Sequence, residues 1–359
     1  LSPWPFAVQS ISIFGAYGLS GIIVACATWI FLGKDNKNSI LLAFCLLVIL
    51  SIYGMQKISR SLVVTNSIAV SIVQGNVDQN QKWEPEYQNS TVNKYLKLSE
   101  LEIKQNRPNL IVWPETAMPF YLQENIVYKQ RILNFAQQNK TLLLTGSPGY
   151  ILHKNNYYHL FNRAYLLYGS GSIIYSYEKE KLVPFGEYVP LKDFLPFLHK
   201  LVAGIGDFVP GKKIEPLRSE ELALGTLICY EAIFTDLVQK RINDGANLLI
   251  NISNDAWFGP TSAPTQHLHQ AILRAVEQNR FLVRATNTGI SAFIDPQGQI
   301  IKKSKSFQEQ TLHLAEVPLI GKKTLYSRYY LTLKITYCIL AIIFALLALF
   351  LPKSKHSQF

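Results

Sequence analysis

The sequence predicts an α/β domain, with sheets sandwiched between helices, that is held to a membrane by apolar helices on either side of it. Two long apolar blocks precede the middle region of the chain and one follows it. In the middle region, short apolar runs typical of buried strands alternate with helical patterns. The 359 residues are enough for one large domain of roughly 250 residues together with membrane helices.

The apolar blocks are long enough to cross a bilayer. Residues 11–33 and 39–55 contain no charged side chain, and neither does Ile335–Leu351. A helix of about 20 residues spans the hydrocarbon core, so we expect three membrane spans rather than three buried core helices. Tyr329 and Tyr330 stand at the entry of the third block, where interfacial aromatic residues are common.

The lysines at the ends of the blocks suggest an orientation. If all three blocks span, the loop at residues 34–38 and the tail with Lys353 and Lys355 share one side. Short lysine-bearing loops favour the cytoplasm, which places the middle region outside, in the periplasm of a Gram-negative bacterium. The chain opens with Leu1 and without a signal-peptide charge pattern, so we expect that upstream sequence is missing.

Composition restricts the partners. The net charge is +11, and beside membrane segments such a charge favours an anionic lipid surface over nucleic acid. The sequence shows no zinc-type Cys/His spacing, no phosphate-binding Gly-Lys loop and no RNA-binding aromatic signature. We therefore expect no metal, no cofactor and no nucleic acid. His267 and His269 lack a third ligand in the sequence and are interpreted as helix-surface or core residues.

The middle region contains five predicted buried strands and four helical patterns. The strands are Ser67–Gly75, Leu110–Trp113, Thr141–Gly146, Leu222–Tyr230 and Ala246–Ser253. The helices are expected at about 89–104, 127–139, 231–243 and 265–279. Hairpin turns are expected at Gly169–Gly171 and at Asp295–Gly298.

Carboxylates and lysines follow two of these strands. Glu115 comes directly after the strand at 110–113 and Pro114, at the strand end where α/β folds place ligand chemistry; the alternative is a helix N-terminal acid. One of the two lysines Lys179 and Lys181 closes a hairpin strand, and Glu187 lies in the following Pro-Phe-Gly-Glu turn. A charge run of this kind is more often a solvated face.

Cys229 is the remaining feature with chemical potential. The other three cysteines, Cys26, Cys45 and Cys338, fall inside the apolar blocks, so Cys229 has no disulfide or metal partner of its kind in the middle region. It is either a small buried hydrophobe or a reactive thiol. Its place between a strand and a helix favours the second interpretation, because a helix N-terminus lowers the pKa of a thiol. Glutamate, lysine and cysteine together form a complete set for covalent catalysis.

The motifs WPE, YEKEKLVPFGEYVP, ICYE and NISNDAWFG occur in this order. Over about residues 67–320 the chain resembles the carbon–nitrogen hydrolase (nitrilase) superfamily, and with its flanking spans it resembles the membrane branch, the apolipoprotein N-acyltransferases. The resemblance implies a four-layer α-β-β-α sandwich. It also implies a boundary near residues 62 and 63 and another near 325 and 326, with two spans before the catalytic domain and one span and a basic tail after it.

The resemblance implies roles for individual residues. Glu115 corresponds to the general base, Lys179 to the catalytic lysine and Cys229 to the nucleophile, with Lys181 as the nearer rival of Lys179. The other positions matched to the family are expected to support this triad or to lie near the substrate path. They are Glu187, Tyr230 and Glu231 as supports, Asn254 orienting the cysteine loop, and Trp83 and Trp257 near the substrate.

The implied reaction is a ping-pong acyl transfer. A phospholipid gives its acyl chain to the cysteine, and the N-terminal amine of a diacylglyceryl-cysteine on an apolipoprotein takes it. The alternatives are a membrane-tethered amidase, in which water resolves the thioester, and an inactive membrane-anchored binding module. The segment Leu191–Pro210 is hypothesised to be a lid or acyl-entry arm, or else an ordinary packed helix. Members of the membrane branch carry more N-terminal spans than the two found here.

Overall fold

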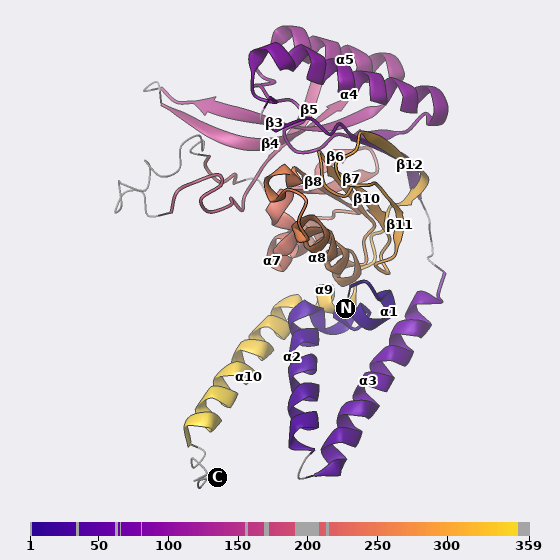
Figure 1. Cartoon of the computed structure of the whole chain (residues 1–359), viewed down its shortest axis with the longest axis vertical. Coiled ribbons are helices and arrows are strands. Elements are labelled where there is room, and N and C mark those ends of the chain that lie inside the picture. Colours follow the sequence, from indigo (N-terminus) through magenta and orange to yellow (C-terminus); the bar gives the residue numbers. More distant parts are fainter. Residues whose placement is uncertain are drawn as a thin grey trace.

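The computed structural model describes residues 2–33, 36–61, 64, 66–79, 81–154, 157–168, 172–190, 208–212 and 215–350. In these residues a layered domain stands on three long helices (Figure 1). The loop residues Lys34 and Asp35, the hairpin turn at Gly169–Gly171, most of the expected lid and the basic tail lie outside the described residues.

The described residues of the domain form two six-stranded sheets. The first has the order β12-β1-β2-β3-β4-β5, with β1 (Ser67–Gln74), β2 (Leu110–Val112), β3 (Leu142–Leu152), β4 (Tyr158–Tyr168), β5 (Ser172–Glu178) and β12 (Gln310–Pro318). The second has the order β11-β10-β9-β8-β7-β6, with β6 (Leu217–Ser219), β7 (Leu222–Ile228), β8 (Leu248–Ser253), β9 (Leu282–Thr286), β10 (Ala292–Ile294) and β11 (Ile300–Lys303). Each sheet has three parallel strands in sequence, β1-β2-β3 and β7-β8-β9, flanked by antiparallel ones.

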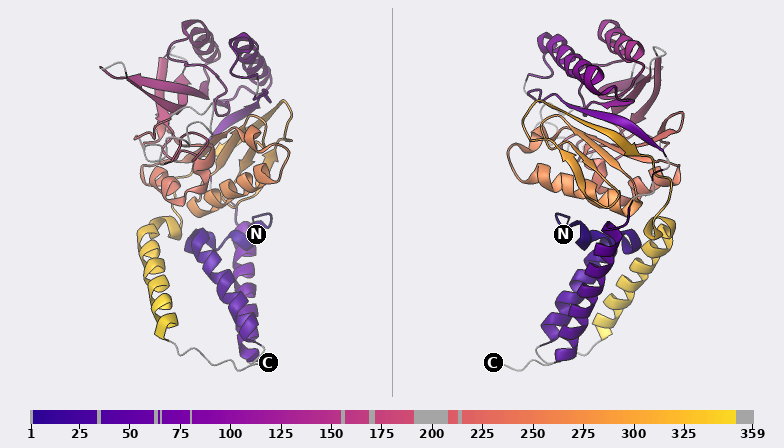
Figure 2. Two further views of the ribbon diagram at one scale, coloured as in Figure 1. Left: turned by 60° about the vertical axis from the view of Figure 1, so that its left-hand side comes forward. Right: turned by 90° about the vertical axis from the view of Figure 1, so that its right-hand side faces the viewer.

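The two sheets pack face to face between pairs of helices. Side chains such as Val112 from the first sheet and Ile250 from the second are fully buried in one shared core. The outer face of the first sheet is covered by α4 (Pro85–Asn106) and α5 (Ile126–Asn139), and that of the second by α7 (Thr235–Asn243) and α8 (Ala263–Gln278). Figure 2 shows the resulting four layers from the side. The predicted α-β-β-α sandwich flanked by apolar helices is confirmed.

The predicted strands and helices are all present, with shifted ends. The strand expected at Leu222–Tyr230 ends at Ile228, and the helix expected at 231–243 is divided into a 3-10 helix, η1 (Cys229–Ile233), and α7. The strand expected at Thr141–Gly146 continues to Leu152 because it pairs with β4 along its whole length. The turn after Asp295 is confirmed: its carboxylate accepts the backbone N–H groups of Gln297 and Gln299, each at 2.8 Å.

Within the described residues, three helices are long and apolar enough to cross a membrane: α2 (Ile11–Leu32), α3 (Lys37–Ile58) and α10 (Tyr330–Phe350). All three point away from the same side of the domain (Figure 1). Short helices join them to it, α1 (Pro5–Val8) before α2 and α9 (Leu325–Arg328) before α10. At 1.5 Å per residue, the 22 residues of α2 extend about 33 Å, which matches a hydrocarbon core of about 30 Å.

Specific contacts fix the membrane helices to the domain. The Gln9 side chain donates to the carbonyl oxygen of Gln297 at 2.7 Å, and the backbone N–H of Ala16 donates to the Glu277 carboxylate at 2.7 Å. Gly15 interrupts α2 with φ +71° and ψ 174°, a conformation that is essentially restricted to glycine. The resulting kink brings α2 against the buried ring of Tyr326 in α9.

We therefore expect Gly15→Ala to weaken the attachment of the domain to its membrane helices. The added methyl group would overlap the Tyr326 ring, and alanine disfavours this φ and ψ, for a combined cost of about 2 kcal/mol or more. The measurement is the melting temperature of the full chain in detergent. Gly21→Ala in the same helix is the matched control, because Gly21 has open space around it; equal melting temperatures for the two variants would contradict the prediction.

Candidate active site

Three strand ends bring the sequence-predicted residues together. Glu115 follows β2 in the first sheet, Lys179 follows β5 of the same sheet, and Cys229 follows β7 of the second. Because β5 runs in the same direction as β2, their carboxyl ends meet at one edge of the sheet. The Lys179 amine lies 3.6 Å from a Glu115 carboxylate oxygen, and both side chains are almost completely buried.

Glu115 is held in place by hydrogen bonds to both of its oxygens. Asn162 of β4 donates its side-chain amide to one oxygen at 2.7 Å, and the backbone N–H of Asn254 donates to the other at 2.8 Å. Gly146 permits this arrangement, because a Cβ there would lie only 2.7 Å from the Glu115 Cα. Asn254, which was expected to orient the cysteine loop, instead contacts the glutamate, and its side chain donates to Gln79 at 2.7 Å.

Lys179 lies between two carboxylates. Its amine is 2.9 Å from Glu187 as well as 3.6 Å from Glu115. Burial opposes the charge of Lys179, but the negative charge of Glu115 in particular outweighs it and raises the pKa of this lysine. Glu187 also accepts the Asn162 amide and the backbone N–H of Val183, so Asn162 links both carboxylates.

Lys181 takes no part in this cluster. Its amine lies 5.8 Å from the centre of the Phe234 ring, at the wall of a cavity. The geometry therefore separates the two lysines that the sequence left as rivals, and it is Lys179 that contacts Glu115 and Glu187.

Glu231 connects the two sheets beneath the site. Its fully buried carboxylate accepts the Tyr177 hydroxyl from β5 at 2.8 and 2.9 Å and the backbone N–H of Ile228 from β7 at 2.8 Å. It also accepts the backbone N–H groups of Glu180 and Lys181, at 2.7 and 3.0 Å. One side chain thus fixes the segment after Lys179 relative to the segment before Cys229.

Cys229 stands at a strained turn. Its φ is +52°, which is uncommon for a residue other than glycine and typical of an elbow that exposes a nucleophile. Burial and then the negative charge of Glu115 raise the pKa of the Cys229 thiol to about 12, against the opposing effect of Lys179. The lowered thiol pKa expected from a helix N-terminus is therefore wrong, because a short 3-10 helix follows the cysteine, and burial, followed by the charge of Glu115, raises the pKa.

A polar cluster that the sequence did not reveal lies behind the cysteine. His267 of α8, interpreted above as a surface or core residue, approaches the carbonyl oxygen of Cys229 at 3.0 Å with one ring nitrogen and Asp255 at 3.1 Å with the other. Arg284 of β9 donates to Asp255 at 2.8 Å and, despite burial, holds the pKa of that carboxyl well below its usual range. Asn251 donates to the same Cys229 carbonyl at 3.3 Å. Among the described residues, no group of three or more His, Cys, Asp or Glu residues could hold a metal ion.

Lys82 is a second buried lysine that the sequence did not reveal. It is 1% exposed, and its amine has no hydrogen-bond partner among the described residues. Burial lowers the pKa of Lys82 to about 8, while the charge of Glu115 acts in the opposite direction. The next residue, Trp83, is 48% exposed, and Trp257 is 76% exposed, so neither expected substrate-path residue is packed into the core.

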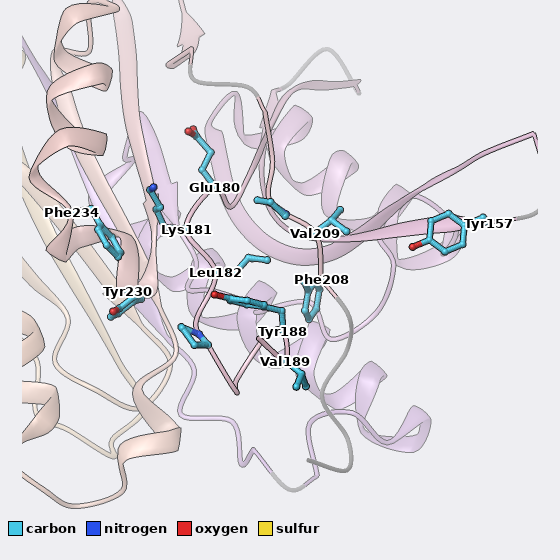
Figure 3. A pocket seen from close by; sticks show the side chains of 12 residues that line it. Tyr157, Glu180, Lys181, Leu182, Tyr188, Val189, Phe208, Val209, Tyr230 and Phe234 are labelled. Atoms are coloured by element: carbon cyan, nitrogen blue, oxygen red, sulfur yellow. The ribbon is translucent and has the colours of Figure 1, made fainter. Parts of the chain in front are cut away.

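A cavity of about 550 Å³ opens beside the cluster. Its lining includes immediate sequence neighbours of the site residues: Glu180 after Lys179, Tyr188 after Glu187, and Tyr230 after Cys229. Figure 3 shows Tyr188 between Tyr230 on one side and Phe208 on the other. Most of the remaining wall is apolar, with Leu182, Pro184, Val189, Val209, Pro210 and Phe234. Of the expected lid, only Phe208–Pro210 are described in the 191–210 range, and they form part of this wall.

The sequence model of the family described as carbon-nitrogen hydrolase matches residues 69–320, more than half of the chain. The chain belongs to the carbon-nitrogen hydrolase family. The superfamily resemblance inferred from the motifs is thereby confirmed.

Solved structures agree in fold. A nitrilase-superfamily protein of Saccharomyces cerevisiae has a TM-score of 0.55 at 19% identity, covering 84% of this chain and 100% of its own. A carbon-nitrogen hydrolase from Helicobacter pylori has a TM-score of 0.53 at 18% identity, covering 70% and 89%.

Curated relatives of this chain carry a more specific name. A protein of Geobacter metallireducens named apolipoprotein N-acyltransferase is 40% identical over 335 residues, which cover 90% of this chain and 63% of the relative. Proteins of the same name from Rickettsia typhi and Haemophilus influenzae are 36% and 34% identical, covering 82% and 86% of this chain. The chain spans about three fifths of the length of these relatives, because the matched regions cover 60% to 63% of their sequences. The apolar helices and these relatives indicate a bacterial membrane protein.

The raised pKa of Cys229 predicts an unusual pH dependence of its alkylation. Because the pKa lies at about 12, the rate of labelling by iodoacetamide should rise about tenfold per pH unit from pH 7 to 10. Mass spectrometry of the Cys229 peptide measures this rate. The same peptide labelled in denaturant is the control and should level off near pH 9; a plateau at that pH in the folded chain would refute the raised pKa.

Lys82→Met should make the folded domain more stable at neutral pH. The folded pKa of about 8 lies below the unfolded value, so below pH 8 the protein bears the full cost of burying the charged amine, about 3 kcal/mol at most. Between pH 8 and 10.5 the unfolded state binds more protons, and the cost declines. The variant should therefore melt higher than the parent at pH 7, with a smaller gain at pH 10. A gain that is equal at both pH values would contradict this origin.

Proposed function

We propose that this chain transfers an acyl chain from a phospholipid, through a thioester on Cys229, to the N-terminal amine of a diacylglyceryl-cysteine on an apolipoprotein. The observation that carries the proposal is the assembly of Glu115, Lys179 and the strained Cys229 beside a largely apolar cavity. The name shared by the curated relatives gives independent support.

In the proposed first half-reaction, Glu115 acts as general base. The thiol of Cys229 is protonated at rest because its pKa is about 12, so attack requires a base, and the carboxylate of Glu115 takes the proton. The sulfur then bonds to the ester carbonyl carbon of the lipid. The Lys179 ammonium, placed beside Glu115, stabilises the developing oxyanion. When the carbon–oxygen bond breaks, the leaving alkoxide of the lysophospholipid takes the proton back from Glu115.

The second half-reaction uses the same groups in the same positions. The acceptor amine attacks the thioester carbonyl carbon, and Glu115 receives a proton from the amine. The tetrahedral intermediate then collapses with loss of the Cys229 thiolate, and Glu115 returns the proton to this thiolate. Glu187 and Glu231 act as positioning residues, one on Lys179 and the other on the strand ends. Tyr230 lines the cavity, and the exposed Trp83 and Trp257 are assigned to the path by which lipid substrates approach.

The membrane helices support the proposal that both the acyl donor and the acyl acceptor are lipids. Acyl donor and acceptor are then anchored in the bilayer to which the domain is attached by α2, α3 and α10. We place the chain in the bacterial inner membrane as a multi-pass protein, with the catalytic domain, about residues 63–325, on the periplasmic side. The short lysine-bearing connection before α3 supports this orientation, and a large domain is translocated largely irrespective of its own charge.

The decisive experiment is mass spectrometry of the full chain after incubation with phospholipid. An acyl adduct on Cys229 is expected, absent in Cys229→Ala. Glu115→Gln should keep the melting temperature within a few degrees and lower adduct formation at least a hundredfold, because general-base catalysis contributes about 10²–10⁴. Lys179→Met should abolish the adduct, whereas Lys181→Met, the matched control, should retain it within about tenfold.

A diacylglyceryl-cysteine peptide added to the acylated enzyme separates the alternatives. Acyl transfer predicts an N-acylated peptide and free thiol. Release of free fatty acid at the same rate with and without peptide would instead identify the membrane-tethered amidase. The absence of any adduct on a folded chain would overturn both enzymatic functions and favour the binding module.

A further inference from the structure

A second cavity, of about 500 Å³, lies where the domain rests on its membrane helices. Its walls come from the start of α2, the end of α3, the turn before β11, and the segment that leads through α9 toward α10, all of which meet at this junction (Figure 1, Figure 2). None of its lining residues belongs to the cavity beside Cys229. We call it the basic pocket, for the five cationic side chains that line it: Lys57, Arg60, Lys322, Lys323 and Arg328.

The charges in the basic pocket are uncompensated. Its described lining contains no Asp or Glu. Lys323 donates to the Asn243 side chain at 2.8 Å, but the side chains of the other four cations form no hydrogen bond or ion pair within the described part of the chain. Like charges that share one cavity repel each other, and the repulsion grows where low-dielectric walls displace water. Lys57 and Lys323 are half-buried, whereas Arg60, Lys322 and Arg328 are exposed. An anion bound between the cations would relieve their mutual repulsion.

The backbone of the pocket is nevertheless well ordered. The Gln297 side chain donates to the carbonyl oxygens of Lys57 and Arg60, at 3.0 and 2.9 Å. On the opposite wall, Arg280 and Asn279 donate to the carbonyl oxygen of Lys322, at 2.8 and 3.0 Å. These bonds fix where the cationic side chains start and leave their charged ends without partners, which is the pattern of a preformed anion site.

The position of the pocket along the membrane normal indicates which anion it binds. Lys57 belongs to the last turn of α3, Ser12 and Ile13 to the first turn of α2, and Arg328 precedes α10 by two residues. These are the ends of the three candidate spans on the domain side, which is the level of the lipid headgroups. Apolar side chains, among them Ile13 and Leu325, complete the lining beside the cations.

We propose that the basic pocket binds the headgroup phosphate of an anionic phospholipid, with Lys57, Arg60, Lys322 and Arg328 around the phosphate. This lipid is a structural ligand at a place distinct from the cavity beside Cys229. The proposal does not depend on the acyl-transfer reaction, because the pocket contains none of the groups assigned to that chemistry. The bound lipid neutralises the junction and holds the domain against the bilayer surface.

The test is native mass spectrometry of the full chain in detergent, titrated with phosphatidylglycerol or with phosphatidylcholine. Cys229→Ala serves as the parent in every measurement, so that no acyl transfer contributes. We expect saturable binding of phosphatidylglycerol and at least tenfold weaker binding of phosphatidylcholine, whose choline offsets the phosphate charge. Lys57→Gln/Arg60→Gln should weaken phosphatidylglycerol binding about thirtyfold, since each cation near an anionic lipid contributes a factor of about five.

Two control variants keep the result interpretable. Lys97→Gln/Lys104→Gln removes the same charge from exposed positions of α4, in the layer farthest from the membrane helices, and should bind as the parent does. Lys57→Arg/Arg60→Lys keeps both charges and should bind within about threefold of the parent. Equal weakening by the two Gln pairs, or loss of binding in the charge-keeping variant, would overturn the proposal.

Soluble anions distinguish a lipid site from a site for free phosphate. Inorganic phosphate and glycerol phosphate should displace phosphatidylglycerol only at concentrations a hundredfold or more above that of the lipid, because they lack its membrane-embedded chains. Displacement at equal concentration would assign the pocket to a soluble phosphate and would refute the lipid.

Discussion

The carboxylate of Glu231 holds the two halves of the site in register. Lys179, Glu115 and Glu187 come from the first sheet and Cys229 from the second, and the shared core between these sheets is apolar, which sets a separation but no register. By accepting donors from β5, from the segment after Lys179 and from β7, Glu231 determines how the two strand ends face each other. A buried carboxylate without these donors would be costly, so the strands and the carboxylate stabilise one another.

Burial, together with the charge balance around the thiol, explains why the thiol rests protonated. Three buried or nearly buried carboxylates, Glu115, Glu187 and Glu231, surround Lys179, and a Cys229 thiolate would add a fourth negative charge. Lys82, whose amine is buried and interacts with Glu115, is the other cation nearby. In such an environment, transfer of the thiol proton to a neighbouring group is more favourable than its release to water. The net charge of the site therefore stays constant during the proton transfer.

The sequence predicted those parts of the fold that depend on local pattern. Buried strands are visible as apolar runs, and Glu115 stands out because it follows such a run directly, whereas Lys179 was separated from Lys181 only by the family motif. The contributions of His267 and Lys82 were invisible, because burial and partners are decided by contacts distant in sequence: His267 reaches a carbonyl 38 residues away, and Lys82 stands in a polar turn that resembles any surface loop. The error on the Cys229 pKa has the same origin, since the following helix is local, whereas the burial of the thiol and the nearness of Glu115 depend on the whole fold.

The attachment of the domain through Gln9, Ala16 and the kink at Gly15 has a kinetic consequence. A domain attached to its helices through these hydrogen bonds keeps one height and one orientation above the bilayer. Its cavity therefore stays at a fixed height above the membrane as the protein diffuses laterally. Encounters with membrane-anchored molecules then depend on their number per area of membrane, and the search is two-dimensional. A molecule that leaves the bilayer is lost to such a site even when its bulk concentration is high.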